Sequence, residues 1–324
     1  MIRLLPENLL EIRSLFIYEI RRIFHENNYL EVETPLMNPG GNVEAFIDSF
    51  QIARSSIRKS PEDYGKNQGK YLITSPEYNL KSQFAHCEKN IFQIAHCFRE
   101  GDVGSLHTEE FLMLEWYRRD CSMEDLMEEC CNLFFSLSKL SFSKIKFSPD
   151  DVKYITIEEL FKKYTGCTLQ YDDLLKYSID KKYINSYMEE NKPRYDEIFF
   201  LIFLNEIEIH LEEDVPCFIY NYPEELAALS RIENGSARRF EIYWKGKELA
   251  NGYEELKGKK ENLHRFRNEN RLRSQQNKNE IPFEDQFLDS MDLLPDSSGI
   301  ALGLDRLLMA LLDESDIRKV TPFL

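Results

Sequence analysis

Residues 91–98 read IFQIAHCF and residues 111–118 read FLMLEWYR, with the polar loop REGDVGSLHTEE between them. Each apolar run has the length of a buried strand, and the loop contains two glycines, which favour turns. Two such runs joined by a polar loop predict a β-hairpin. Further strands separated by polar loops, with helices elsewhere, indicate an α+β fold built on a mainly antiparallel sheet.

Other segments on either side of this hairpin have the pattern of helices or strands. Apolar residues recur at helical spacing over residues 7–27, and Ser75-Pro76-Glu77 has the composition of a helix start, with Ser75 as the N-cap. Residues 239–256 predict a strand, a Lys-Gly turn and a second strand. The remaining expectations are strands at 29–34, 46–53 and 71–74, a loop at 54–70, a mainly helical insertion at about 123–230, a charged helix at 257–280, and a small-residue strand that continues into an apolar helix at 300–312.

The composition limits the classes of protein to which the chain can belong. The 324 residues are 42% hydrophobic and 30% charged, which supplies a folded core and excludes intrinsic disorder. The formal charge of -16 disfavours generic nucleic-acid binding, because phosphate contacts need a basic surface. Seven cysteines without a C-x-x-C pair predict reduced, mostly buried thiols. With no signal peptide and no apolar run of membrane-spanning length, we expect a soluble cytoplasmic protein.

Arg99 and Phe111 lie at the two ends of the loop in the hairpin. A guanidinium at the end of a strand can hold two phosphate oxygens, and a phenylalanine ring offers a flat face on which a purine can stack. Taken separately, a surface arginine and a core phenylalanine are the simpler interpretation. The pair indicates a nucleotide site only in combination with the two further groups of residues described next.

Oxygen ligands gather in the second predicted hairpin, at Glu241, Glu248, Asn251 and Glu255. Such carboxylates repel one another unless a cation offsets their charge, and an oxygen-only set favours Mg²⁺. One of them could instead receive an ammonium group of a substrate. Ordinary glutamates on a strand surface are an equally good interpretation of this cluster in isolation.

The segment Gly299-Ile-Ala-Leu-Gly-Leu-Asp-Arg306 combines small residues with an arginine at a helix start. Small residues let a ligand approach the backbone closely, and the arginine could stack on a base or hold a terminal phosphate. A tightly packed junction of strand and helix is the alternative. Together the three groups suit ATP with Mg²⁺, although the chain has neither a P-loop nor a G-x-G-x-x-G fingerprint.

These segments resemble motifs 1, 2 and 3 of the class II aminoacyl-tRNA synthetases: the helix and strand that end at Pro35, the hairpin from Phe98-Arg99 to Phe111, and Gly303-Leu-Asp-Arg306. Thr74-Ser-Pro-Glu77, Leu114-Glu-Trp-Tyr117 and Glu248-Leu-Ala-Asn-Gly-Tyr-Glu-Glu255 are similar to the lysine-specific branch. Lysyl-tRNA synthetases carry an oligonucleotide-binding domain before motif 1, for which this chain has no room. It therefore resembles their shortened paralogues, which modify translation elongation factor P. The resemblance implies a single catalytic domain over residues 1–324.

The resemblance also implies a role for individual residues. Arg99 would hold the α-phosphate, Phe111 and Arg306 would sandwich adenine, and Arg99 and Arg306 would be catalytic. The implied ATP contacts are Arg99, Glu100, Gly101, His107, Thr108, Phe111, Glu248, Leu249, Gly303 and Arg306. The implied contacts to the amino acid are Ser75, Pro76, Glu77, Tyr117, Asn251, Tyr253, Glu255 and Ala301, and the implied Mg²⁺ ligands are Glu241 and Glu248. The chain departs from the family at Glu100-Gly101, where Asn-Glu is common.

The function implied by the resemblance is activation of (R)-β-lysine, or lysine, as an aminoacyl-adenylate and its transfer to a lysine of elongation factor P. Ala301 stands where lysyl-tRNA synthetases have glycine, and its methyl group would disfavour α-lysine. Three alternatives are a tRNA-charging enzyme, an aspartate- or asparagine-type enzyme, and a non-catalytic regulator with the same fold. A homodimer is implied because motif 1 forms the subunit interface in this class. The basic helix at 257–273 is either a docking surface for an acidic protein or an ordinary solvated helix.

Overall fold

The computed structural model describes residues 4–52, 70–184, 192–211 and 213–323. The chain folds into two compact units. Unit 1 comprises Met1–Cys121, Leu256–Met309 and Asp313–Leu324, and unit 2 comprises Ser122–Glu255 and Ala310–Leu312. The polar loop predicted at 54–70 falls almost entirely outside the described residues. The prediction of one catalytic domain stays a prediction.

The predicted hairpin forms the centre of unit 1 and is confirmed almost to the residue. Strand β5 (Ile91–Phe98) pairs antiparallel with β6 (Glu110–Arg119), and β6 pairs antiparallel with β12 (Ser297–Gly303). On the other side of β5, the short strand β1 (Leu30–Glu31) runs parallel to it. The mainly antiparallel arrangement predicted from the sequence is therefore confirmed for this sheet.

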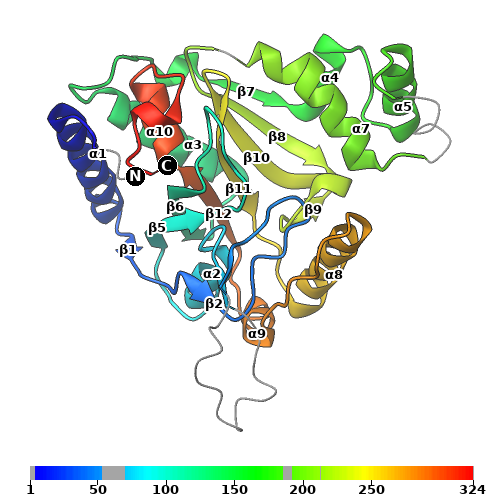
Figure 1. The fold of residues 1–324 in the computed structure, drawn as a ribbon, viewed down its shortest axis with the longest axis horizontal. Coiled ribbons are helices and arrows are strands. Elements are labelled where there is room, and N and C mark those ends of the chain that lie inside the picture. Colours follow the sequence, from blue (N-terminus) through cyan, green and yellow to red (C-terminus); the bar gives the residue numbers. More distant parts are fainter. Residues whose placement is uncertain (1–3, 53–69, 185–191, 212, 324) are drawn as a thin grey trace, which may run out of the picture. The chain divides into compact units, whose positions relative to one another are not determined.

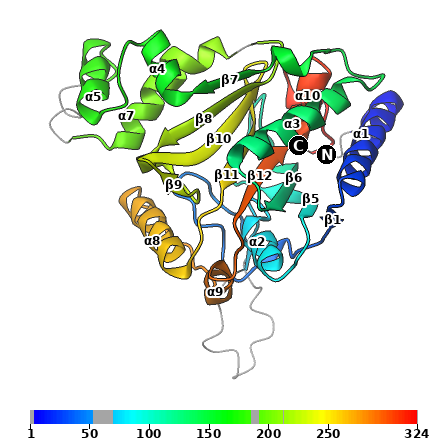
Figure 2. The same ribbon diagram turned by 180° about the vertical axis from the view of Figure 1, so that it is seen from behind.

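The first helix of unit 1 forms where the apolar period of the sequence predicts it. Helix α1 (Glu7–Glu26) buries Leu9, Phe16, Ile20 and Phe24, which lie on one face at helical spacing. It runs directly into β1 (Figures 1 and 2). The other helices of unit 1 are α2 (Glu77–Ala85), α8 (Lys259–Gln275), α9 (Asp285–Met291) and α10 (Leu304–Leu311).

Several predicted strands of unit 1 are shorter than their sequence pattern. The strand expected at 29–34 pairs only at Leu30–Glu31, and the one expected at 46–53 only at β3 (Gln51–Ile52). β3 belongs to a small second sheet with β4 (Lys70–Leu72) and β2 (Met37–Asn38). Alternation in the sequence predicts an extended backbone, but a strand exists only where a neighbour supplies hydrogen bonds.

Unit 2 contains the second predicted hairpin, formed by β10 (Ser236–Trp244) and β11 (Lys247–Glu254). Strand β8 (Cys217–Pro223) pairs antiparallel with β10, and β7 (Lys153–Thr156) pairs parallel with β8. The short strand β9 (Ile232–Glu233) also pairs with β10. The sequence analysis did not predict β7 and β8 within the supposed helical insertion, because both lie among helical patterns and β7 has only four residues.

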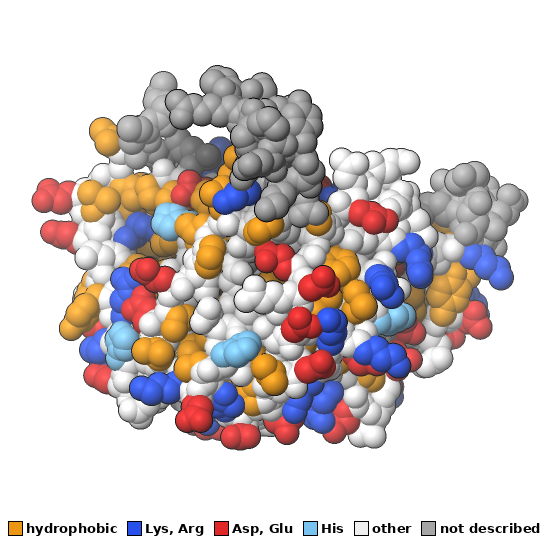
Figure 3. Space-filling model, turned by 90° about the horizontal axis from the view of Figure 1, so that it is seen from below, with side chains coloured by type: hydrophobic (Ala, Val, Ile, Leu, Met, Phe, Trp, Pro, Cys, Tyr) orange, Lys and Arg blue, Asp and Glu red, His pale blue; other side chains and the backbone are white. Residues whose placement is uncertain are grey.

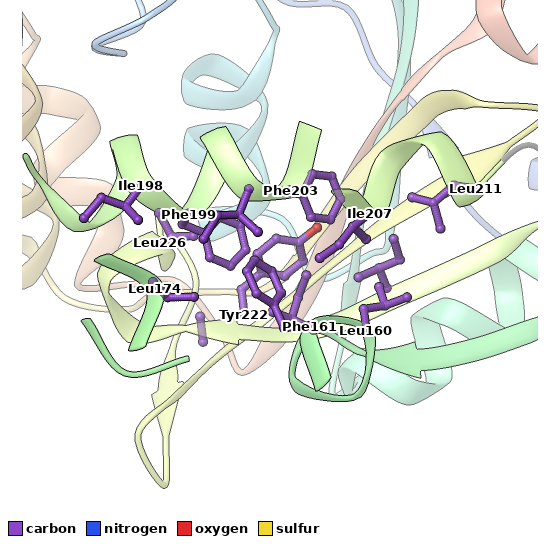
Figure 4. Close-up of a cluster of buried hydrophobic side chains, with 14 of the residues drawn as sticks. Leu160, Phe161, Leu174, Ile198, Phe199, Phe203, Ile207, Leu211, Tyr222 and Leu226 are labelled. Atoms are coloured by element: carbon purple, nitrogen blue, oxygen red, sulfur yellow. The ribbon is translucent and has the colours of Figure 1, made fainter. Parts of the chain in front are cut away.

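The rest of the insertion is helical, as predicted. Its helices are α3 (Met123–Ser138), α4 (Ile157–Tyr164), α5 (Tyr171–Asp180) and α7 (Tyr195–Ile202). Side chains from α4, α5, α7 and β8 form one buried cluster, in which Phe161 and Phe199 stack with ring centroids 4.8 Å apart (Figure 4). Short 3-10 or π turns occur at Pro149–Asp151, Phe203–Ile207, Glu208–His210, Glu224–Leu226 and Ile317–Lys319.

Gly252 leaves space for the Phe240 ring opposite it on β10. A Cβ at residue 252 would lie 2.4 Å from two ring atoms of this fully buried phenylalanine, which cannot move aside. We expect Gly252→Ala to lower the free energy of unfolding by about 1–3 kcal/mol, measured by urea denaturation. The control is Gly104→Ala, where nothing lies within 4 Å. Equal effects of the two substitutions would contradict the packing at Phe240.

The prediction of reduced, mostly buried thiols is confirmed. All seven cysteines are free, and five of them are buried. Acidic, basic and apolar side chains are interspersed on the face drawn in Figure 3. Within the described residues, no helix combines the length and the apolar character that a membrane span requires.

Candidate active site

The strand register of unit 1 brings several predicted site residues to one face of the sheet. Phe111, Glu115 and Tyr117 alternate along β6, so their side chains point to the same side. Ala301 on β12 is the direct neighbour of Glu115 and therefore shares this face. Gly299 and Gly303 flank Ala301 at alternate positions, so β12 presents almost no side-chain bulk there. The part of this sheet face between Phe111 and Tyr117, called the floor below, therefore has little side-chain bulk on its β12 side.

Arg99 and Phe111 are brought together at one end of this floor. The Arg99 guanidinium carbon lies 5.1 Å from the centroid of the Phe111 ring, and the Arg99 backbone N–H donates to the Glu109 carbonyl at 2.9 Å. The Arg99 Nε is buried and has no hydrogen-bond partner among the described residues. A buried N–H donor without a partner is costly, so this guanidinium is prepared to meet an anion.

Arg306 is fixed against the loop of the same hairpin. Its Nε donates to the Leu106 carbonyl at 3.1 Å, and its Nη2 makes a close contact with Nε2 of His107. The preceding Asp305 is buried, accepts from the Leu112 backbone N–H at 2.8 Å, and pairs with Arg13 at 2.7 Å. These contacts hold the start of α10 beside the Arg99–Phe111 hairpin.

The loop that follows Arg99 has a backbone suited to glycine. Gly101 has a φ of 82°, in the left-handed region, and its N–H donates to a Glu109 carboxylate oxygen at 3.0 Å. Thr108 is buried and donates to the Glu110 carbonyl at 2.7 Å. Glu100 is exposed and donates its backbone N–H to the Asp48 carbonyl. A role for Glu100 in reading adenine stays a prediction.

Charged and polar groups are buried at the Tyr117 end of the floor. The Tyr117 hydroxyl donates to Glu115 at 2.5 Å, and both residues are almost fully buried. Lys81 on α2 is also buried, pairs with Glu77 at 2.6 Å, and lies 5.8 Å from the centroid of the Tyr117 ring. Buried carboxylates close to an aromatic ring suit a substrate ammonium group.

The start of α2 holds Glu77 in this position. The Ser75 hydroxyl accepts from the Glu77 backbone N–H at 3.4 Å and from the Asn42 side chain at 3.1 Å. The N-cap position belongs to Pro76, not to Ser75 as predicted, because the first helical residue is Glu77. Ser75 therefore anchors the helix start from one position further out.

Glu44 is a half-buried residue that the sequence analysis did not single out. It accepts from the Thr74 hydroxyl at 3.0 Å. Burial raises the pKa of Glu44, and the nearby Arg99 offsets part of this increase while Glu77 adds to it. The carboxylates at this end of unit 1 are thus crowded enough to influence one another.

The predicted metal ligand Glu241 lies in a network within unit 2. One of its oxygens accepts from the Tyr222 hydroxyl at 2.7 Å and from the Tyr243 hydroxyl at 3.3 Å, and the other accepts from Arg239 at 2.5 Å. Arg239 also donates to Asn251 at 3.2 Å and lies 4.7 Å from the Tyr222 ring centroid. Burial and the Glu241 charge raise the pKa of Tyr222, so this hydroxyl stays protonated and donates.

The other predicted residues of unit 2 lie on β11 or directly after it. Asn251 and Tyr253 share the face of Glu241 and Arg239 through the strand register, and the Asn251 amide donates to the Tyr253 hydroxyl at 3.0 Å. Leu249 and Glu255 are buried. Glu248 pairs with Tyr243 in the register, beyond an irregularity at which Leu249 of β11 has no partner on β10.

The oxygen donors of unit 2 fit Mg²⁺ in part. A carboxylate offers about four acceptor directions, and three donors already occupy those of Glu241. Glu241 could therefore add one bond to a cation without losing its present partners. Among the described residues, no group of three or more His, Cys, Asp or Glu side chains forms a ready metal site. Any ion here would need further oxygens from the nucleotide.

Comparison with known proteins identifies the family of the chain. The family model described as tRNA synthetases class II (D, K and N) matches residues 5–324. The chain belongs to this family of class II tRNA synthetases. Membership makes it a ligase, and the activation reaction of this class uses ATP. The α+β fold and the resemblance inferred from the motifs are therefore confirmed.

The synthetase also has similar relatives over its whole length. It is 35% identical to the elongation factor P–(R)-β-lysine ligase of Buchnera aphidicola subsp. Schizaphis graminum, over 96% of this chain and 94% of that protein. It is 34% identical to the Proteus mirabilis protein of the same name, over 98% and 94%. It is 33% identical to the homologue of this ligase in Aquifex aeolicus, over 96% and 97%.

The structure brings together part of the predicted synthetase site within each unit. In unit 1, Arg99 meets Phe111 and Arg306 meets His107. In unit 2, Glu241 and Asn251 share one network through Arg239. The joint role predicted for Tyr117 and Glu255 involves both units and stays a prediction, as do the individual ligand contacts.

Two buried charged residues of the synthetase, Lys81 and Glu115, and the half-buried Glu44 escaped the sequence analysis. A glutamate inside the apolar run FLMLEWYR was a usable signal for Glu115, because burial of an unpaired carboxylate is costly. No such signal existed for Lys81, because Glu and Lys four residues apart are typical of an exposed helix face.

The contact between His107 and Arg306 predicts a measurable titration. Burial lowers the pKa of His107, and the positive charge of Arg306 lowers it further. We expect Arg306→Met to raise the His107 pKa toward its ordinary value without reaching it, since burial is the larger cause. A ring-proton NMR titration, with the signal assigned by His107→Gln, measures this. An unchanged or lower pKa would contradict the contact.

Proposed function

We propose that this synthetase activates lysine or (R)-β-lysine with ATP as an aminoacyl-adenylate and transfers the acyl group to a lysine of elongation factor P. One observation carries the proposal: a single sheet face has the Arg99 guanidinium beside Phe111 at one end and the buried carboxylate Glu115 at Tyr117 at the other. This arrangement suits a molecule with a phosphate and a distant ammonium group. The names of the full-length relatives support the acceptor.

The first step needs no general base. The substrate carboxylate is ionised at neutral pH, so its oxygen attacks the α-phosphorus directly and pyrophosphate leaves. Arg99 orients the α-phosphate and offsets the charge that develops there, and Arg306 would hold the adenine ring against Phe111. Glu241 and Glu248 would hold Mg²⁺, which neutralises phosphate charge when bound. The acceptor amine then attacks the acyl carbon and AMP leaves.

Ala301 is proposed to select the substrate. Its side chain is half-buried on the floor and packs against the buried cluster that contains Met113, as Phe111 also does. We expect Ala301→Gly to raise kcat/KM for α-lysine about tenfold, because one methyl group is typically worth about 1–3 kcal/mol in discrimination. Pyrophosphate exchange with α-lysine and (R)-β-lysine measures the ratio. The control is Ala237→Gly on β10, and unchanged α-lysine kinetics in Ala301→Gly would contradict this role.

We also propose that the synthetase is a homodimer. Helix α1 leaves Leu10, Leu15 and Tyr18 exposed outside its buried stripe. Exposed apolar side chains on a helix suit contact with a second copy of the chain. Sedimentation equilibrium of the wild type and of a Leu10→Glu/Tyr18→Glu variant tests the proposal.

The proposed function is tested by mass spectrometry of the acceptor. Purified elongation factor P is incubated with the synthetase, ATP and α-lysine or either enantiomer of β-lysine, and tRNA charging is measured in parallel. We expect one lysyl or β-lysyl addition to elongation factor P and no aminoacyl-tRNA. Charging of tRNA with an unmodified protein acceptor would overturn the proposal in favour of a tRNA synthetase.

A further inference from the structure

Helix α8 carries a stripe of exposed basic residues on one side. Lys260, His264, Arg267 and Arg271 follow the spacing i, i+4, i+7 and i+11, which places them on one helical face. All four are exposed. At a rise of about 1.5 Å per residue, the stripe is about 17 Å long.

The cations of this stripe differ from the other cations around α8. Lys257 pairs with Asp296 at 2.9 Å, Lys259 with Asp289 at 2.5 Å, and Arg273 with Asp48 at 2.9 Å. In contrast, Lys260, Arg267 and Arg271 have no carboxylate partner among the described residues. A chain with a formal charge of -16 has ample carboxylates to pair such cations. The stripe is therefore an uncompensated positive surface on an acidic protein.

The opposite face of α8 is attached to the loop beside Arg99. Arg273 is buried and donates to the carbonyls of Glu44 and Ile47 at 2.8 and 3.1 Å. Glu269 accepts from the Ala45 backbone N–H at 2.8 Å. The Asp48 carbonyl in the same loop accepts from Glu100, the residue after Arg99. Arg273 thus has a structural role and does not belong to the basic surface predicted at 257–273.

We propose that the stripe Lys260–His264–Arg267–Arg271 docks an acidic surface of the protein acceptor. This inference rests on the proposed function and extends it to the second step. Opposite charges steer partners into contact and fix their orientation. The stripe lies on the face of α8 opposite the one that contacts the loop bordering the site, so only the width of the helix separates the two. A protein partner is favoured over a nucleic acid, because the net charge of the chain repels an extended polyanion.

Charge reversal separates docking from chemistry. The test variant is Lys260→Glu/Arg267→Glu/Arg271→Glu, and the matched control reverses three exposed lysines of unit 2, as Lys162→Glu/Lys176→Glu/Lys182→Glu. We expect the test variant to raise KM for elongation factor P about tenfold at low salt, with a smaller effect as salt increases. Pyrophosphate exchange and the transfer rate at saturating acceptor should stay unchanged, as should all parameters of the control.

Three outcomes would overturn the docking surface. The first is an equal KM for elongation factor P in the test and control variants. The second is loss of tRNA binding in the test variant with an unchanged KM for elongation factor P, which would assign the stripe to nucleic acid. The third is a wild-type enzyme that activates the amino acid but never modifies elongation factor P. Only this third outcome would also reject the proposed function.

Discussion

Arg99→Met is expected to reduce kcat/KM for amino-acid-dependent pyrophosphate exchange by about 10³-fold, because it removes the donor that meets the charge developing on the α-phosphate. The stability of the fold should change little. The Arg99 Nε is buried without a partner among the described residues, so its removal abolishes an unsatisfied donor and leaves no new one. Activity and stability are thus predicted to separate at this residue.

The measurement combines exchange kinetics with thermal denaturation of the same samples. Arg318→Met is the control, since its guanidinium is exposed and pairs with Asp316 on the surface. It should retain both activity and melting temperature. A loss smaller than about tenfold in Arg99→Met would contradict the role of this arginine in the chemical step.

Lys81→Met is expected to lower the free energy of unfolding by about 3–5 kcal/mol, because it leaves the Glu77 carboxylate without its buried partner. It should also raise KM for the amino acid, since Glu77 loses the contact that orients it. Chemical denaturation and exchange kinetics measure the two effects. Lys89→Met, at an exposed lysine just after α2, should change stability by less than about 0.5 kcal/mol.

A double-mutant cycle distinguishes pairing from simple loss of packing. The Lys81→Met/Glu77→Gln variant should be less destabilised than the sum of the two single variants, because each substitution already breaks the pair. Additive effects would show that the two residues are independent. A lower KM in Lys81→Met would instead indicate that Lys81 competes with the substrate ammonium group for Glu77.

Local sequence patterns predicted the two hairpins that carry the site. The run at 91–98 is apolar except for single polar residues, which a strand tolerates. In the second hairpin, the Lys245-Gly246 turn separates β10 from β11. The strands β7 and β8 were missed because their pairing with each other is long-range and both lie among helical patterns. Pairing partners distant in the chain leave no periodic signal in either strand.

Site residues could be predicted where the residue type and its place in a strand or loop indicate a chemical role. They could not be predicted where packing between distant segments decides the role. Arg99 and Phe111 were predicted from their positions at the strand ends, and they lie in contact. Arg273 was counted among the solvent-facing basic residues of the helix at 257–273, but the fold buries it against the loop at Glu44. One of the donors to Glu241, Tyr222, was equally hidden, because it comes from a strand that was not predicted.

A crystal structure with a non-hydrolysable lysyl- or β-lysyl-adenylate analogue tests the central claim most directly. We predict that the adenine ring lies on Phe111, that the phosphate or its mimic contacts Arg99, and that the distal ammonium group points toward Glu115 and Tyr117. An analogue bound away from this sheet face, or bound with its phosphate far from Arg99, would contradict the claim that one face of unit 1 gathers the nucleotide and the amino acid.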